Sequence, residues 1–126
     1  THQGSRPLQW SVELAASARS HAESCFKGHS KSGYGENIAW ATYGQKPEKV
    51  VARWYGEAAK YEYDSPGFSS STGHFTQIVW LGTREVGCAC KSDCPGRFSD
   101  FCVCQYNPPG NYRNEFSANV LPPRKK

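Results

Sequence analysis

The sequence predicts an α+β domain with an antiparallel sheet, stabilised by disulfides. Helical patterns come first, over residues 11–25 and 47–60, and extended patterns follow over residues 75–80, 85–90 and 101–106. Because helices and strands do not alternate along the chain, this order favours α+β over a doubly wound parallel sheet. Six cysteines in 126 residues are typical of an oxidising compartment, so we expect a secreted, extracellular protein.

Length and composition narrow the classes of function. The length suits a single domain over residues 1–126. Hydrophobic residues make up 37% of the chain, which argues against disorder. No apolar run approaches the ~18 residues that a transmembrane helix requires, so we expect any membrane contact to be peripheral. The net charge is +4, and the tail at residues 124–126 supplies most of it, so no nucleic-acid partner is expected.

Two segments have the pattern of helices. Residues 11–25 begin with the N-cap candidate Ser11, and small residues recur along one face of this segment, at positions 15, 18 and 22. Such a narrow apolar face suits close packing on a sheet. Residues 47–60 form the second predicted helix, because Pro47 fits a first helical turn. Its apolar stripe, which Glu57 flanks, consists of Val50, Val51, Trp54 and Ala58.

The remaining segments predict strands and loops. Residues 75–80 are rich in β-branched and aromatic residues, which predicts a buried central strand that begins at His74. Two more strands are predicted at 85–90 and 101–106, whereas residues 36–40 are ambiguous between a helical turn and a strand. Loops, turns or extended ends are expected at 27–35, 61–73, 107–111 and 120–123.

The cysteine spacing predicts a disulfide pattern. In an antiparallel hairpin, one register places Cys88 opposite Cys104 and also Cys90 opposite Cys102, on one face of the two strands. Directly opposed residues lie within disulfide range. The remaining cysteines would then form Cys25–Cys94, which ties the first helix to the sheet. A crossed pairing within the hairpin is the alternative, and zinc is disfavoured because the cluster contains no CxxC pair.

Two histidines and two glutamates form the most suggestive polar set, namely His29, Glu36, Glu57 and His74. Such residues can bind a divalent metal or perform acid–base chemistry. Their spacing alone is also compatible with four hydrogen-bonding surface residues. No nucleophile is evident, since the cysteines are assigned to bridges and the hydroxyls at residues 69–72 lie outside any G-x-S-x-G motif.

Four segments resemble the signatures of one family. Residues 73–80 (GHFTQIVW) resemble G-H-[FY]-T-Q-[VI]-[VI]-W, and residues 102–111 (CVCQYNPPGN) resemble C-x-Y-x-P-x-G-N. Residues 35–39 (GENIA) resemble G-E-N-[LI]-A, and residues 54–57 (WYGE) resemble W-x-x-E. By these motifs the chain is identified as a pathogenesis-related-1-like secreted member of the CAP superfamily, named after cysteine-rich secretory proteins, antigen 5 and pathogenesis-related 1 proteins.

The resemblance implies a three-layer α-β-α sandwich with a central antiparallel sheet and a cleft that holds a His, Glu, Glu, His tetrad. By motif, His29 matches the histidine upstream of G-E-N, and Glu36 matches the glutamate within it. Glu57 matches the glutamate of W-x-x-E, and His74 the histidine of G-H-F-T-Q. In some members the two histidines bind zinc, so zinc or another divalent cation is the expected cofactor.

The resemblance also implies a lipid ligand. Members of the family are implicated in sterol and fatty-acid binding through a loop with an aromatic-x-aromatic-x₄-aromatic pattern, which Tyr61, Tyr63 and Phe68 fit. A loop packed on its own sheet is the alternative. Members usually begin with a long helix, whereas six residues precede Pro7 here. Either the chain has been cut within that helix, or one helical layer is thinner than usual.

These observations favour a non-enzymatic, secreted binding protein for a sterol or another lipid, acting in defence or host interaction. The alternative is a metal-dependent, protease-like hydrolase, in which the metal activates water and a glutamate of the tetrad is the base. A third hypothesis places the activity in surface loops, as in signalling or venom-type proteins.

Overall fold

The fold is described from a computed structural model, over residues 8–26, 28–41, 47–96 and 99–122. The predicted N-terminal truncation, the basic tail and the last extended residue, Pro123, lie outside these residues. The elements follow the order β1 (Gln9–Trp10), α1 (Val12–Ser24), β2 (Gly35–Ala41), α2 (Pro47–Gly56), a 3₁₀ turn η1 (Glu57–Lys60), α3 (Gly73–Val79), β3 (Glu85–Lys91), β4 (Asp100–Asn107) and α4 (Phe116–Asn119).

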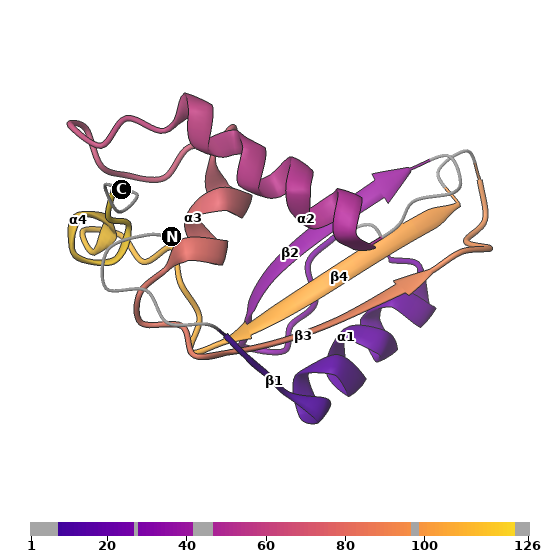
Figure 1. The fold of residues 1–126 in the computed structure, drawn as a ribbon. Helices are drawn as coiled ribbons and strands as arrows, with labels where there is room; N and C mark the ends of the chain where they lie inside the picture. The colour runs from indigo at the N-terminus through magenta and orange to yellow at the C-terminus, as the bar shows by residue number, and fades with distance from the viewer. Residues whose placement is uncertain (1–7, 27, 42–46, 97–98, 123–126) are drawn as a thin grey trace.

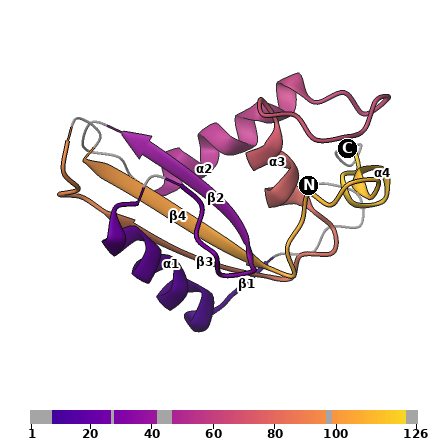
Figure 2. The same cartoon turned by 180° about the vertical axis from the view of Figure 1, so that it is seen from behind.

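The three-layer α-β-α arrangement is confirmed. The sheet has the order β1-β3-β4-β2, and β4 is antiparallel to both β2 and β3. The two-residue edge strand β1, which the sequence pattern did not predict, pairs in parallel with β3. Helix α1 covers one face of the sheet, and α2 and α3 lie on the other (Figure 1), as the reverse view also shows (Figure 2).

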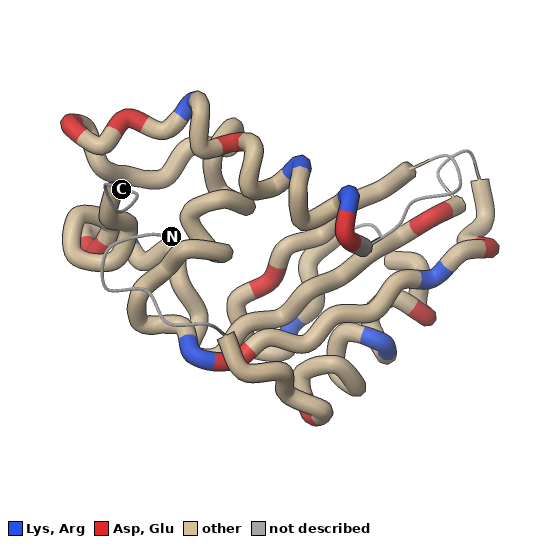
Figure 3. The backbone as a smooth tube through the Cα atoms, in the orientation of Figure 1, with Lys and Arg blue, Asp and Glu red and all other residues tan. Residues whose placement is uncertain are grey.

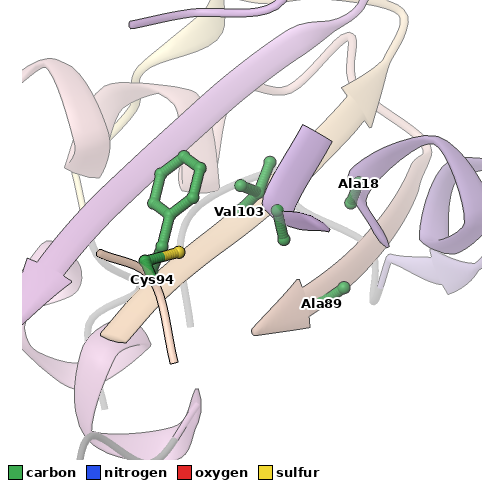
Figure 4. Packing of buried hydrophobic residues seen from close by; sticks show 6 residues of the cluster. Ala18, Ala89, Cys94 and Val103 are labelled. Atoms are coloured by element: carbon green, nitrogen blue, oxygen red, sulfur yellow. The ribbon is translucent and has the colours of Figure 1, made fainter. Parts of the chain in front are cut away.

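Alternation along β4 divides the core between these two faces. Phe101 and Val103 pack with Ala18 and Ala22 of α1 and with Ala89 of β3 (Figure 4). The intervening β4 residues point to the opposite face and pack against Val50 and Trp54 of α2, and they are Cys102, Cys104 and Tyr106. This is the side-chain period of two that a strand buried on both faces must have.

Small residues let α1 lie directly on the sheet, as its sequence predicted. A Cβ added at Gly87 of β3 would collide with the backbone of Leu14 and Ala15. The helix begins as predicted at Ser11, whose Oγ accepts a hydrogen bond from the Leu14 N–H at 3.1 Å. It ends at Cys25, which takes a left-handed conformation with φ of 54°.

All three predicted disulfides are present. Cys88–Cys104 and Cys90–Cys102 bridge β3 and β4 with Cα–Cα distances of 4.1 and 4.0 Å, in the predicted register. Cys25–Cys94 joins the end of α1 to the loop between these strands, with a Cα–Cα distance of 5.5 Å. The crossed alternative is therefore excluded.

The prediction of a strand over residues 75–80 is wrong, because residues 75–79 lie in helix α3 and Trp80 caps its C-terminal end. His74 consequently lies in the first turn of a helix, not at the start of a central strand. Most of α3 is buried, including Phe75, Thr76 and Val79. A short helix that is buried on most sides lacks an apolar–polar period, and a run of this kind cannot be distinguished from a buried strand by pattern alone.

Two other boundaries became clear in the structure. The ambiguous residues 36–40 belong to strand β2, where Ile38 and Trp40 pack against the α1 side of the core. The second helix ends at Gly56 and continues as the 3₁₀ turn η1 to Lys60, which matches the predicted end.

Candidate functional site

The first half of the predicted tetrad is a His–Glu pair at the start of β2. The Nδ1 atom of His29 lies 2.9 Å from Oε1 of Glu36. The Glu36 side chain is only 4% exposed, whereas that of His29 is 64% exposed. The carboxylate is therefore buried and points its histidine partner toward solvent.

Three further hydrogen bonds hold the Glu36 carboxylate. The Ser30 N–H donates to Oε1 at 2.8 Å, the Ser30 hydroxyl donates to Oε2 at 2.5 Å, and the Gln105 amide donates to Oε2 at 2.7 Å. Burial raises the pKa of Glu36, but the hydrogen bonds from Ser30 and Gln105 lower it further than burial raises it. The net result is a pKa below the ordinary value, so this carboxylate is a stable anion at neutral pH.

The second half of the tetrad joins η1 to α3. Oε2 of Glu57 lies 2.8 Å from Nδ1 of His74, and Oε1 accepts the backbone N–H groups of His74 and Phe75, each at 3.1 Å. The His74 ring stacks on Trp54 of α2, with centroids 5.4 Å apart and planes 14° apart. Glu57 thus satisfies two of the free amides at the start of α3 while it orients the imidazole.

The structure brings the four predicted residues together as two pairs. Among the residues that it describes, no group of three or more His, Cys, Asp or Glu side chains is placed to hold a metal ion. Along β2 the side chains alternate, so Glu36 faces its cross-strand partner Gln105 whereas Asn37 points to the opposite face of the sheet. It is Asn37 whose amide donates to the His74 carbonyl, at 3.1 Å, and to the Tyr106 hydroxyl, at 3.2 Å.

A glycine fixes how closely α3 approaches the start of β2. A Cβ added at Gly35 would collide with the side-chain oxygen of Gln77. That oxygen accepts the Gly110 N–H at 2.9 Å, and the amide nitrogen of Gln77 donates to Thr83 at 3.1 Å. Gln77 and Gly35 therefore link α3, β2 and the turn after β4 into one packed unit beside the Glu57–His74 pair.

The three predicted lipid-binding aromatic residues have different environments. Tyr61 is 8% exposed and packs against Phe75 of α3, and Tyr63 packs edge-on against Tyr61 with ring centroids 5.0 Å apart. Phe68 is 65% exposed. Two of the three rings are thus largely structural, and only Phe68 presents most of its surface to solvent.

Phe68 lies at the rim of a hollow of about 660 Å³. The hollow lies between the 61–72 segment and the segment that leads into α4, which occupy the same end of the molecule (Figure 1). Its apolar lining includes Pro66, Phe68 and Phe116, and its polar lining includes Arg113 and Asn114. Phe116 is 3% exposed and packs edge-on against Trp80, so one wall of the hollow belongs to the core.

Sequence reasoning missed the residues that position the tetrad, which are Ser30, Asn37, Trp54 and Gln105. Gln105 is fully buried, although its residue type is usually exposed. A register that aligned β2 with β4 would have placed Gln105 opposite Glu36 and identified it. Because residues 36–40 could be either a helical turn or a strand, the sequence did not predict this pairing of β2 with β4.

Charged side chains of both signs are interspersed along the described backbone (Figure 3). In the same part of the chain, no helix combines the length and the apolar character needed to cross a bilayer.

Comparison with known families agrees with this geometry. A profile of the cysteine-rich secretory protein family, abbreviated CAP, matches residues 1–106. The chain belongs to the CAP family. It is 39% identical over 116 residues to pathogenesis-related protein 1 of Arabidopsis thaliana, covering 89% of this chain and 71% of the plant protein.

Two other CAP relatives are longer than this chain. It is 46% identical over 125 residues to Protein PRY2 of Saccharomyces cerevisiae, covering 96% of this chain and 37% of the yeast protein. It is 48% identical over 93 residues to the human Golgi-associated plant pathogenesis-related protein 1, covering 72% of this chain and 59% of that protein. The chain therefore spans about two fifths and three fifths, respectively, of these relatives.

Solved CAP structures share the fold. BmVAL-1 superimposes with a TM-score of 0.77 at 26% identity, covering 97% of this chain and 68% of BmVAL-1. The structure of NaASP2 with Zn²⁺ gives the same TM-score at 25% identity, covering 98% of this chain and 70% of that chain.

Proposed function

We propose that this CAP domain is a secreted binding protein for a sterol or fatty acid, and that the hollow beside Phe68 is its lipid site. The observation that carries the proposal is a largely exposed aromatic ring at the rim of a cavity with a partly apolar lining. The CAP resemblance implies a sterol or fatty acid as ligand, which supports the same proposal. The three disulfides and the likeness to a plant pathogenesis-related protein support secretion and a role in defence or host interaction.

The size and lining of the hollow suit a lipid. Ligand sites usually measure ~300–1,000 Å³ and combine an apolar lining with a few polar groups. A flat sterol body placed in the hollow would remove apolar surface of Phe68 from water and would pack against the buried wall that Phe116 forms. This burial contributes ~25 cal/mol per Å². Arg113 offers a charge for the carboxylate of a fatty acid at the same rim.

The test is binding of labelled cholesterol and labelled palmitate to the wild-type protein and to Phe68→Ala. We expect the affinity for both lipids to fall about tenfold or more, because the ligand loses one aromatic wall. Phe26→Ala is the matched control, since Phe26 is 61% exposed but lies beyond the end of α1. Equal affinities of wild type and Phe68→Ala would reject this hollow as the site.

The two His–Glu pairs support a second candidate function, binding of zinc or another divalent cation. In each pair the carboxylate contacts Nδ1, which leaves Nε2 as the free ligand atom of the imidazole. A carboxylate that orients a histidine in this way is the usual outer partner of a zinc ligand. His29 and His74 would therefore hold the ion, with Glu36 and Glu57 behind them. The solved relative NaASP2 is described with Zn²⁺.

A bound zinc would supply Lewis acidity and could lower the pKa of a water. The pairwise arrangement favours binding over hydrolysis, because a catalytic zinc usually has three protein ligands. Calorimetric titration with zinc chloride tests this candidate. His29→Ala and His74→Ala should each weaken binding at least tenfold, whereas Glu23→Gln on α1 should not. Zinc-dependent proteolysis that is abolished by Glu36→Gln and Glu57→Gln would instead support the hydrolase.

A further inference from the structure

The two margins of the sheet differ in how their edges are covered. On the β3 side, β1 pairs in parallel with the strand, and the Ser11 N–H donates to the Val86 carbonyl at 2.9 Å. Further along the same edge, the Arg19 guanidinium donates to the Cys90 carbonyl at 2.8 Å. A very short strand and a charged side chain thus protect this margin, which are common ways to keep a sheet edge from pairing with another chain.

Strand β2 forms the other margin (Figures 1 and 2), and among the described residues no further strand pairs with it. It is seven residues long, and its register with β4 runs without a bulge from Gly35 to Ala41. The strand contains no lysine, arginine or proline, and the side chain of its one charged residue, Glu36, is buried. A long edge without such protection is a site at which another strand can pair.

The neighbouring hairpin shows which backbone groups of β2 point outward. In the two disulfides between β3 and β4 the Cα atoms are 4.1 and 4.0 Å apart, a separation typical of pairs that do not exchange backbone hydrogen bonds. The N–H and C=O groups of Cys102 and Cys104 therefore point away from β3 and toward their partners in β2, which are Ala39 and Asn37.

The backbone groups of Glu36 and Ile38 consequently point to the open edge, because they alternate with those of Asn37 and Ala39 along the strand. In the described part of the chain, neither residue has a backbone hydrogen bond on that side. Each residue presents one N–H donor and one C=O acceptor there. These groups are spaced as an incoming extended chain requires.

A wall stands on each side of this open edge. On one face of the sheet, the Glu36 side chain contacts His29 of the loop at 28–34, at 2.9 Å. On the other face, the Asn37 amide donates to the His74 carbonyl of α3 at 3.1 Å. The edge at Glu36 thus lies between a loop and a helix. A single extended segment can pair between them, whereas a second sheet with its own covering helices would meet both walls.

We propose that the β2 edge at Glu36 and Ile38 binds an extended peptide segment of a partner protein, which adds a fifth strand to the sheet. In this mode of recognition, main-chain hydrogen bonds supply affinity and the flanking side chains supply specificity. Ile38 and Ala39 are partly exposed and uncharged, so the segment that fits them carries apolar, β-branched side chains and no proline. This inference requires neither the lipid nor the zinc function proposed above.

The test begins with selection of a phage-displayed library of random octapeptides on the wild-type protein with its disulfides intact. We expect enrichment of peptides with β-branched residues at alternate positions, and we measure binding of the most enriched peptide, labelled with fluorescein, by fluorescence polarisation. Ile38→Pro removes an N–H that faces the open edge, which an edge strand tolerates, and it should weaken binding at least about tenfold. Ile38→Ala is the matched control, because it truncates the side chain but keeps the N–H, and it should weaken binding only about threefold.

Methylated peptides test the same pairing on the unaltered protein, should Ile38→Pro fail to fold. Methyl groups on the amides of every second residue block one edge of the selected peptide. One of the two alternate patterns should abolish binding, and the other should leave the affinity within about threefold. Equal loss from both patterns, the absence of any enriched peptide, or equal affinities of wild type and folded Ile38→Pro would overturn the inference. A dimer in sedimentation that Ile38→Pro abolishes would assign the edge to a second copy of this chain and would also overturn it.

Discussion

The two His–Glu pairs of this CAP domain use the same two residue types but are held in different ways. Side chains and one backbone amide from a loop and from β4 surround Glu36, which is almost fully buried. Glu57 is 20% exposed and is held mainly by two backbone amides of α3. The first carboxylate depends on particular side chains, and the second depends on where a helix begins.

The histidines differ in the opposite sense. His29 is 64% exposed, whereas His74 is 34% exposed and stacks on Trp54. The better-buried carboxylate thus carries the freer imidazole. This contrast indicates that substitutions near Glu36 should act through the network of hydrogen bonds, and those near His74 through packing.

The largest expected effect on stability comes from Gln105→Leu, which alters the hydrogen bonds around Glu36. The substitution removes the donor to Glu36 and Ser30 from a fully buried position, which should lower the free energy of unfolding by about 2–3 kcal/mol. Urea denaturation with intact disulfides measures it. Gln105→Glu, which sets a second carboxylate beside Glu36, should be at least as destabilising. A loss below about 0.5 kcal/mol in both variants would show that Glu36 does not depend on Gln105.

Glu57→Ala should have a smaller effect, of about 1–2 kcal/mol. The change leaves the amides of His74 and Phe75 without their acceptor, which resembles the loss of a helix cap. Glu57→Gln keeps an oxygen for these amides and should cost less than half as much. If the glutamine variant were as unstable as the alanine variant, the charge of Glu57, and not its capping role, would be the important property.

The pH dependence of stability should report on the buried Glu36 carboxylate. The pKa of Glu36 is lowered in the folded protein, so its contribution is fully present above the unfolded value of 4.5 and is lost as the pH falls through the folded pKa. Unfolding free energies of the wild type and Glu36→Gln, measured from pH 6 to pH 3, should therefore converge below pH 4.5. Parallel curves over this range would contradict the assignment.

The smallest effect is expected for the exposed histidine. His29→Ala should change stability by about 0.5 kcal/mol or less, since its ion pair with Glu36 is largely exposed on the histidine side. His74→Ala should cost about 1 kcal/mol, because it also removes the stacked contact with Trp54. Thermal unfolding of the two variants at one pH measures this order. A larger loss of stability in His29→Ala than in His74→Ala would contradict it, and would show that His29 has a structural role despite its exposure.

Several features of the fold could be predicted because they follow from short-range periodicity. The spacing of Cys88, Cys90, Cys102 and Cys104 allows one hairpin register to form two bridges, since side chains on a strand repeat every two residues. Three small residues on one face of α1 indicated close packing on the sheet for a similar reason. The CAP motifs likewise identified the four tetrad residues by position alone.

Other features depend on contacts between distant segments. Residues 75–79 form a helix that packs against α2, η1 and β2, and their composition alone does not record these long-range contacts. Tyr61 and Phe68 belong to one aromatic pattern, yet one is in the core and the other in solvent, since only Tyr61 reaches Phe75. Gln105 became part of the site through its pairing with Glu36 across 69 residues.

The sequence by itself thus determined the family, the disulfides and the identity of the two histidines and two glutamates. These are local or motif properties, which a linear pattern records. Only the tertiary structure decided that the four residues meet as two His–Glu pairs, that Phe68 is the exposed ring of the aromatic pattern, and that Gln105 holds the Glu36 carboxylate. Each of these depends on which face of an element meets which neighbour, and that is set by packing across the whole chain.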